Sequence, residues 1–495
     1  MTTTAIRVDG SPRLGFGHLM RCLALADALR AAGSEVVFLC GSEAGHRNEF
    51  PVSKGYRVAT LPPGRSAQWS AREDAAQTIA LLQGLAPVDW MVVDHYGLSR
   101  DWEHAVRSHC RRIMVIDDLA DRPHDCDALL DQNLSALRPG RYDGLVPGSC
   151  ERLLGPEFAL LRAEFRVARE SARSRDGQVR RMLVSFGAGD QADQTLLAIR
   201  AIDRIAERRF TVEVVIGPDE QNARRVREAC AGRSGIHVHC DVADMAAMIA
   251  SADVAIGGGG VSMLERCCLG LPSLVVTLAD NQESGARALA ERGAIINLGR
   301  AERLDEASLE IAVAAVLRAP ELLHHVSTQA WQLVDGRGAI RVARRLCGTP
   351  IRIRRATSDD RDRALEWRNA EATRAGSFEH GRISADQHRT WFSGALSSDS
   401  RVLLIGETGA EPVGVLRYDI EGLLASVSVY LAPDLHGRGL GPELLRAGDR
   451  WLRENLPEVR EVRAEILSSN AVSRAAFRSA GFGEYGEILV KQLRT

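Results

Sequence analysis

Strand-like and helical stretches alternate along the first two-thirds of this 495-residue chain. Short apolar runs such as EVVFLC (35–40), WMVVDHY (90–96) and RRIMVIDDL (111–119) are separated by segments long enough for helices. The alternation restarts at RRMLVSFGAGD (180–190) and continues to PSLVVTL (272–278). This alternation is typical of parallel sheets with helices on both faces. We therefore predict two doubly wound, Rossmann-type α/β domains, 1–168 and 169–347, with a ligand cleft at the carboxyl ends of their strands.

The pattern changes near LCGTPI (346–351), where glycine and proline indicate a boundary. Beyond it, the short strands VLLIGE, PVGVLRYDI and ASVSVYL follow one another closely, before a glycine-rich loop and a helix. Strands grouped in this way predict a separate α+β domain over 348–495.

Composition excludes several classes of partner. The formal net charge is −2, which gives no reason to expect a nucleic-acid partner. No apolar run approaches the roughly 20 residues that span a bilayer, and the start lacks the regions of a signal peptide, so we expect a cytoplasmic protein without membrane insertion. The ten cysteines contain no C-x-x-C pair and no metal-ligand spacing. We expect reduced thiols and no metal.

The segment RLGFGHLMRCLALADAL (13–29) reads as a glycine turn followed by a helix. Gly15 and Gly17 permit a close approach of a ligand to the backbone, and His18 follows at the helix start. Unpaired N–H groups there disfavour an imidazolium, so a neutral His18 could accept a proton. The alternative is a histidine that caps the helix or packs under a loop. The apolar residues at helical spacing predict a buried stripe of Leu19, Cys22, Leu23, Ala26 and Leu29.

A second motif, ADVAIGGGGVSMLERCCLGLPSLVVTLADNQ (252–282), runs from a strand through glycines into a helix. Free backbone N–H groups at such a helix start can bind a diphosphate. The carboxylate of Glu265, one turn into the helix, can accept hydrogen bonds from ribose hydroxyls. Asn281 and Gln282, which follow the next strand, could contact a base or sugar. The alternative is a close-packed turn with a solvated glutamate. The candidate residues are Gly258, Gly259, Gly260, Glu265, Asn281 and Gln282.

The order of this second motif resembles the nucleotide-binding half of GT-B sugar-nucleotide enzymes. Together with RVDGSPRLGFGHLMRCLALADAL, VVDHYGLSRDWE, VIDDLADRPHDCDALLDQNL, LLGPEFALLRAEF, VSFGAGD and DGRGAIRVARRL, it resembles the nucleotide-sugar hydrolases of pseudaminic acid biosynthesis, over about residues 5–346. The resemblance implies metal-independent release of a 2,4-diacetamido-2,4,6-trideoxy-altropyranose from UDP. Water attacks the anomeric carbon with inversion, and the matching residue for the base is His18.

Polar residues at two strand ends are further candidates. Asp94, His95 and Tyr96 end one predicted strand, and Asp94 or Tyr96 could orient the sugar or the water. A turn-capping role for the aspartate is the alternative. Asp117 and Asp118 end the next strand. We interpret Asp117 as structural, and contact with the substrate is the alternative.

Each of three further side chains could either contact a ligand or have another role. Asn133 could hold sugar hydroxyls or close a loop, and Arg13 and Arg21 could balance phosphate charge or be solvated. In VSFGAGD, Ala188 replaces the second glycine of the family's usual pair, which leaves a close backbone approach plausible.

The last domain carries VSVYLAPDLHGRGLGPELL (427–445), which resembles the acetyl-CoA-binding motif of GNAT acetyltransferases. NAVSRAAFRSAGF (470–482) resembles their second cofactor helix, and the match covers about residues 351–493. Backbone amides of the glycine loop could bind a pyrophosphate. The resemblance implies acetyl-CoA as co-substrate, contacted by Leu431, His436, Gly437, Arg438, Gly439, Gly441, Asn470 and Ser473.

Two residues depart from the GNAT pattern. His436 stands at the first position of the loop motif, where glutamine or arginine is usual. Phe477 occupies the place of the tyrosine that protonates the leaving thiolate, so the general acid is unassigned between Tyr430 and Tyr485.

Together the resemblances predict a bifunctional enzyme. It would N-acetylate a UDP-linked 4-amino sugar with acetyl-CoA and then release UDP from the product. A GT-B transferase using a UDP-amino sugar and a non-catalytic nucleotide-sugar-binding protein are the alternatives. The sugar stereochemistry, the preferred acyl group and the oligomeric state stay open.

Overall fold

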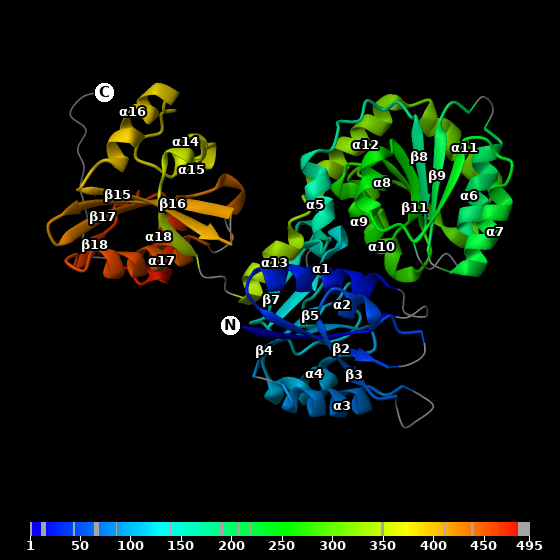
Figure 1. Ribbon diagram of the computed structural model, residues 1–495, viewed down its shortest axis with the longest axis horizontal. Helices are drawn as coiled ribbons and strands as arrows, with labels where there is room; N and C mark the ends of the chain where they lie inside the picture. Colours follow the sequence, from blue (N-terminus) through cyan, green and yellow to red (C-terminus); the bar gives the residue numbers. More distant parts are fainter. Residues whose placement is uncertain are drawn as a thin grey trace. The chain divides into compact units, whose positions relative to one another are not determined.

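The computed structural model divides into two compact units, Met1–Cys347 and Gly348–Thr495 (Figure 1). It describes residues 2–10, 16–42, 45–63, 69–85, 87–138, 140–187, 193–205, 208–217, 219–347, 351–409, 411–436 and 440–483.

The first lobe of the N-terminal unit is a parallel sheet of seven strands in the order β3-β2-β1-β4-β5-β6-β7. Its strands are β1 (Thr3–Val8), β2 (Glu35–Gly41), β3 (Arg57–Leu61), β4 (Val88–Asp94), β5 (Cys110–Ile116), β6 (Ala128–Asp131) and β7 (Glu151–Leu154). Its helices are α1 (Gly17–Ala31), α2 (Glu49–Ser53), α3 (Ala71–Gln83) and α4 (Arg100–Val106), and α5 (Ala163–Glu170) follows β7.

The second lobe is a six-stranded parallel sheet in the order β10-β9-β8-β11-β12-β13. Its strands are β8 (Arg181–Ser185), β9 (Thr211–Ile216), β10 (Ile236–Cys240), β11 (Val254–Gly258), β12 (Ser273–Thr277) and β13 (Ile296–Arg300). The helices are α6 (Gln194–Asp203), α7 (Glu220–Cys230), α8 (Met245–Ser251), α9 (Val261–Cys268), α10 (Asp280–Glu291), α11 (Glu306–Leu317), α12 (Pro320–Leu333) and α13 (Gly338–Cys347). Both sheets confirm the doubly wound α/β architecture.

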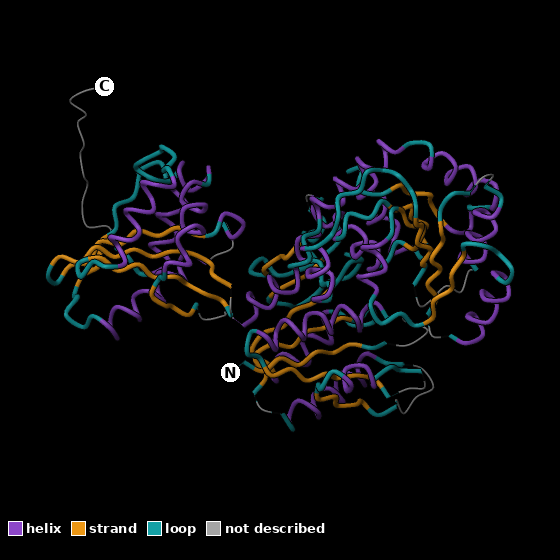
Figure 2. The backbone as a smooth tube through the Cα atoms, turned by 45° about the horizontal axis from the view of Figure 1, so that its top comes forward, coloured by secondary structure: helices purple, strands orange, loops and turns teal. Residues whose placement is uncertain are grey.

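Helices cover both faces of the two sheets (Figures 1 and 2). Successive residues of a strand point to opposite faces, so Ala5 packs in the core of α3 and α4, whereas Ile6 packs in the core of α1. The predicted stripe of α1 is buried as expected: Leu19, Cys22, Leu23, Ala26 and Leu29. The last helix, α13, returns to the first lobe and joins its core through Val342 and Leu346.

The C-terminal unit is a five-stranded sheet in the order β14-β15-β16-β17-β18, with α14–α16 on one face and α17 and α18 on the other (Figure 1). The strands are β14 (Arg352–Arg355), β15 (Arg401–Thr408), β16 (Glu411–Glu421), β17 (Leu424–Leu431) and β18 (Glu461–Arg463). The helices are α14 (Arg361–Asn369), α15 (Glu371–Ala375), α16 (Ala385–Leu396), α17 (Leu440–Asn455) and α18 (Ala471–Ala480). β14 to β17 pair antiparallel, and β17 and β18 pair parallel, as in an α+β domain.

The ten cysteines are free thiols. The Sγ atoms of Cys126 and Cys150 lie 3.6 Å apart. Among the described residues, no helix is long and apolar enough to cross a membrane. Within the same ranges, no group of three or more histidine, cysteine or acidic side chains could hold a metal ion.

Candidate functional site

His18 is the second residue of α1, and its imidazole is fixed by Asp94 at the end of β4. The Nδ1 atom lies 2.6 Å from Asp94 Oδ1. A carboxylate only accepts, so Nδ1 carries the hydrogen and donates to it, and in the neutral imidazole the lone pair then lies on Nε2. Arg21 Nη2 also lies 3.1 Å from Nδ1, but its shorter contact, over 2.6 Å, is to Asp94 Oδ1. The side chain of His18 is 13% exposed, whereas that of Asp94 is fully buried. The arrangement therefore presents Nε2 as a proton acceptor of fixed orientation.

Arg21, one turn further along α1, completes this contact. Its Nε and Nη2 atoms each lie 2.6 Å from an oxygen of Asp94, and its Nη1 lies 3.1 Å from Asp118 Oδ2. Burial raises the pKa of Asp94, but Arg21 and His18 outweigh it and hold that pKa well below the usual range. Arg21 is buried and paired with two carboxylates, so the alternative of a solvated arginine is wrong.

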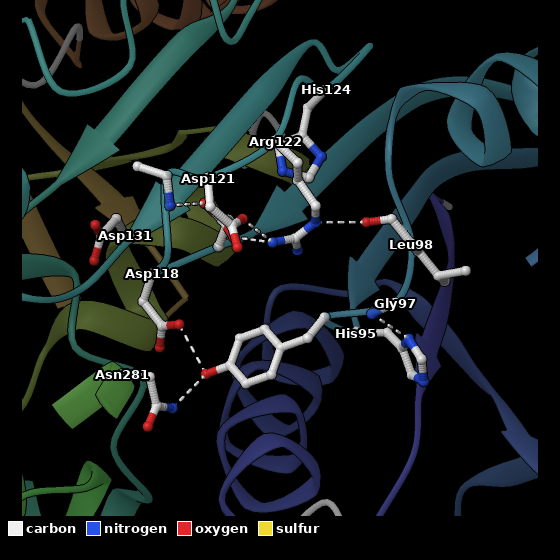
Figure 3. A network of polar contacts seen from close by, with 12 residues as sticks. His95, Gly97, Leu98, Asp118, Asp121, Arg122, His124, Asp131 and Asn281 are labelled. Carbon is white, nitrogen blue, oxygen red and sulfur yellow. Dashed lines mark hydrogen bonds and ion pairs between the residues drawn. The ribbon is translucent and has the colours of Figure 1, made fainter. Parts of the chain in front are cut away.

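Tyr96 connects the two lobes. Its hydroxyl donates to Asp118 Oδ1 over 2.8 Å and accepts from Asn281 Nδ2 of α10 over 3.0 Å (Figure 3). Burial and the Asp118 carboxylate raise the pKa of Tyr96 far above its usual value, so it stays a neutral phenol. Its ring meets the imidazole of His18 edge to face, with centroids 4.6 Å apart. The sequence did not single out Asp118 as a site residue.

The starts of α1 and α9 meet across the two lobes. A Cβ placed on Gly17 would lie 3.7 Å from Val261 Cγ2, the first residue of α9. Within the described ranges, no side chain caps either helix and neither first turn holds an acidic residue. The first N–H groups of a helix have no partner inside the helix, and both helix dipoles favour an anion there.

Some of the glycines before α9 allow close packing of the backbone, and the last of them lies at the start of the helix. A Cβ on Gly257 would lie 2.2 Å from Ser185 O, and one on Gly258 would lie 3.2 Å from Phe186 O, so β11 must pass close to β8 there. A Cβ on Gly259 would lie 3.3 Å from Gln282 Cβ, and Gly260 is the N-cap residue of α9. Close packing thus explains the first glycines, while Gly260 sits at the open helix start.

Glu265 and Gln282 lie behind this loop. Gln282 accepts from Leu278 N over 2.9 Å and so supports the loop rather than projecting freely. Glu265 is 3.5 Å from Arg162 Nη2 and its side chain is 15% exposed. Burial raises the pKa of Glu265 despite the arginine. Arg162, at the start of α5, was not predicted as part of the site.

The side chains of Asn133 and Asp117 contact other parts of the N-terminal unit. The Asn133 side chain lies against α10, with its Oδ1 3.3 Å from the Cβ position of Gly285. Asp117 is buried, pairs with Arg122 over 3.1 Å and accepts from Ala120 N over 2.9 Å, in a turn where Ala120 has a positive φ. This placement agrees with a structural Asp117.

Several predicted positions lie outside the described residues. They are Arg13, Gly15, Ala188, Gly437, Arg438, Gly439 and Tyr485.

In the C-terminal unit, β17 is only partly paired on its outer side. β18 pairs with Leu424–Ser426, and no pairing to β18 is described for Val427–Leu431. That stretch therefore offers backbone groups to an extended ligand, in the manner of strand addition. Leu431 O accepts from His436 Nε2 over 3.3 Å, so His436 bridges the end of this edge. Gly441 lies in the first turn of α17, where a Cβ would be 3.5 Å from Ala476 of α18.

Asn470 and Ser473 begin α18. Asn470 Oδ1 accepts from Ser473 N over 2.9 Å as the N-cap, and its Nδ2 donates to Gly376 O over 3.0 Å. The Asn470 side chain is thus committed to holding α18 against the segment after α15.

Of the two candidate acids, Tyr430 and Tyr485, only Tyr430 lies among the described residues. Phe477 is buried and packs edge to face on Phe482, with centroids 5.0 Å apart. Tyr430 lies 3.5 Å from Ala364 O, and burial raises its pKa above the usual value.

Two segments match known families. Residues 351–483 match the acetyltransferase (GNAT) domain, and residues 189–336 match the glycosyltransferase family 28 C-terminal domain. The uncharacterized Methanocaldococcus jannaschii protein MJ1062 is 21% identical over 97% of this chain and 96% of its own. A Campylobacter jejuni UDP-2,4-diacetamido-2,4,6-trideoxy-beta-L-altropyranose hydrolase is 26% identical over 58% of this chain and 96% of its own.

A solved structure agrees at the level of fold. Acinetobacter baumannii MurG superposes with a TM-score of 0.50 at 15% identity, covering 70% of this chain and 99% of that one. The Met1–Cys347 unit thus has the paired Rossmann domains of GT-B glycosyltransferases, and residues 351–483 form a GNAT acetyltransferase domain.

Proposed function

We propose that the Met1–Cys347 unit hydrolyses a UDP-linked sugar, with His18 as the general base. The observation that carries this proposal is the Asp94 contact, which fixes the Nδ1–H tautomer beside the opposed starts of α1 and α9. A base held in this way needs only a water on the Nε2 side to deprotonate it during attack on the anomeric carbon. Tyr96, whose ring packs on His18, would orient the sugar or the water.

The diphosphate would lie between the starts of α1 and α9. The amides around Gly17 and Gly260 supply the donors, and both helix dipoles stabilise the charge that develops on the departing UDP. Glu265 would accept from the ribose, and Asn281 and Gln282 would stand near the sugar or base. Because these contacts neutralise the leaving group, the proposed reaction needs no metal.

For the substrate we propose a UDP-2,4-diacetamido-2,4,6-trideoxy sugar. The Campylobacter relative, which is similar over 96% of its own length and is named as a hydrolase of such a UDP-sugar, supports this class.

For the GNAT domain we propose acetyl-CoA-dependent acetylation of the 4-amino group of the precursor UDP-sugar. The free edge of Val427–Leu431 would hold the pantetheine, and the start of α17 with Gly441 would face the pyrophosphate. Since Phe477 cannot protonate a thiolate, positioning of the amine would carry most of the catalysis. Two consecutive steps on one chain raise the local concentration of the intermediate.

The test is to supply purified full-length protein with the 4-amino UDP-sugar, with and without acetyl-CoA, in H₂¹⁸O and without any acceptor. We expect acetylated free sugar and UDP only when acetyl-CoA is present. Attack at carbon leaves UDP free of ¹⁸O, whereas attack at phosphorus labels it. Turnover that requires an added acceptor would indicate a glycosyltransferase, and binding without turnover would indicate a nucleotide-sugar-binding protein.

A further inference from the structure

Asp118 stands where two hydrogen-bonded paths meet. It follows β5, and its two carboxylate oxygens have different partners: Oδ1 accepts from Tyr96 and Oδ2 accepts from Arg21. Its side chain is 13% exposed, so both bonds are largely shielded from water. In Figure 3 the Asp118 and Asn281 side chains approach the same hydroxyl group from opposite lobes.

The first path leads to the proposed base. Asp118 holds Nη1 of Arg21, and the rest of that guanidinium grips Asp94 with two bonds of 2.6 Å. Asp94 Oδ1 in turn accepts from His18 Nδ1. Because the guanidinium is planar and rigid, it couples the Asp118 carboxylate to the Asp94 carboxylate, and through Asp94 to the imidazole of His18.

The second path leads to the other lobe. Tyr96 O–H donates to Asp118, and Asn281 Nδ2 donates to the same hydroxyl from α10. The next residue of α10, Gln282, supports Gly259 and therefore the loop that precedes α9. A displacement of α10 would therefore be transmitted to Asp118 through the hydroxyl group of Tyr96.

We propose that Asp118 is a positioning residue that makes the orientation of His18 depend on the contact between the lobes. This inference rests on the proposed role of His18 as base. With Asn281 seated on Tyr96, both oxygens of Asp118 are occupied and Arg21 is held in place. When the lobes separate, Tyr96 loses its donor from α10, and the restraint on the Asp118 carboxylate weakens. Proton transfer is thereby reserved for the closed arrangement, in which the diphosphate is bound.

The competing explanation is that Asp118 only balances the charge of buried Arg21. Both explanations expect a less stable Asp118→Asn variant, so stability does not separate them. They differ in whether the loss of rate passes through His18. A merely structural aspartate would also weaken UDP binding as it loosens the fold, whereas a positioning residue would leave binding largely unchanged.

The experiment measures hydrolysis of the acetylated UDP-sugar and UDP affinity for full-length Asp118→Asn, His18→Ala and the double variant. Asp121→Asn is the matched control, since Asp121 is an exposed neighbour on the same loop that pairs with Arg122. We expect Asp118→Asn to lower kcat by about 10²-fold, the scale of a misplaced reacting group, with UDP affinity within about threefold. In the His18→Ala background, Asp118→Asn should cost less than about threefold more.

Three outcomes would overturn the proposal: kcat within threefold of the unchanged protein, an equal loss in the His18→Ala background, or a loss explained by weaker UDP binding. If His18→Ala itself retains full activity, the proposed base fails, whatever Asp118 does. Should Asp118→Asn not fold, Tyr96→Phe removes the same bond to Oδ1 while keeping the ring against His18. It must then lower kcat and be silent in the His18→Ala background, or the proposal is refuted.

Discussion

Replacing Asp94 with asparagine should damage both stability and catalysis. Asp94 accepts three charge-assisted bonds of 2.6 Å, two from Arg21 and one from His18, and its side chain is fully buried. Asparagine has one oxygen where aspartate has two. At least one of the bonds from Arg21 is therefore lost, and the guanidinium then faces the Nδ2 group, which is itself a donor. Bonds to charged groups contribute about 1.5–3 kcal/mol each, and breaking a buried pair costs about 3–5 kcal/mol. We therefore expect a loss of about 4 kcal/mol.

Hydrogen exchange of peptides covering β4 measures this loss locally, which avoids a two-state assumption for a chain of several domains. A loss of about 4 kcal/mol lowers the protection factor about 10³-fold, because each 1.4 kcal/mol is a factor of ten. In the unchanged protein, the low pKa of Asp94 means that its contribution is present above about pH 4 and declines only as the pH falls further. The variant should lack this acid-dependent loss.

The fall in kcat should be at least as large as the fall in the protection factor, because asparagine no longer enforces the Nδ1–H tautomer of His18. In the serine protease triad, the same change costs about 10⁴-fold. We expect a fall in kcat of about 10³-fold or more, measured under single turnover at saturating substrate. Protection of β4 within tenfold of the unchanged protein would refute the burial argument. Turnover within tenfold in a folded variant would refute the role of the dyad.

Four further predictions follow from the same geometry. His18→Asn should slow hydrolysis by about 10²-fold or more while UDP affinity stays within about threefold, and a rate within a few-fold of normal removes it from the mechanism. Glu265→Ala should mainly raise KM, because ribose contacts hold ground state and transition state alike; a fall in kcat alone would contradict this. Burial raises the pKa of Asp131 to about 6, so its ionisation costs stability as the pH rises from about 4 to 6. Asp131→Asn should abolish that decline in urea titrations at a series of pH values, and an unchanged decline would point to another group. Residues 1–347 and residues 349–495, produced as separate polypeptides, should each fold and retain one activity, hydrolysis or acetylation; loss of both activities on separation would show that the units depend on each other.

The fold could be predicted because it follows from the period of apolar residues. Buried strands such as β4 and β11 read as continuous apolar runs, and α1 carries its core residues at helical spacing. The return of α13 to the first lobe had no comparable signal. Its apolar stripe shows only that one face is buried, and the sequence does not say against which lobe.

The site was predicted in part for a related reason. His18, Asp94 and Tyr96 follow from the rule that ligands meet the carboxyl ends of strands, and the structure brings these three together. Asp118 was not singled out beside Asp117, because adjacent side chains at a strand end diverge and either could face the cleft. The role of Arg21 stayed open for a different reason: a sequence does not show which carboxylates will surround a cation. Their positions depend on the order of strands in the sheet.

The opposed starts of α1 and α9 also bear on the order in which products leave. Each helix start carries about half a positive charge, so an empty cleft holds two like charges against each other. A bound diphosphate removes this repulsion, and the closed arrangement is stabilised by mass action in proportion to the ligand present. Hydrolysis of the glycosidic bond does not alter that diphosphate, since UDP keeps it intact. On the proposed mechanism the free sugar would therefore leave before UDP, and UDP would act as a competitive inhibitor of the UDP-sugar.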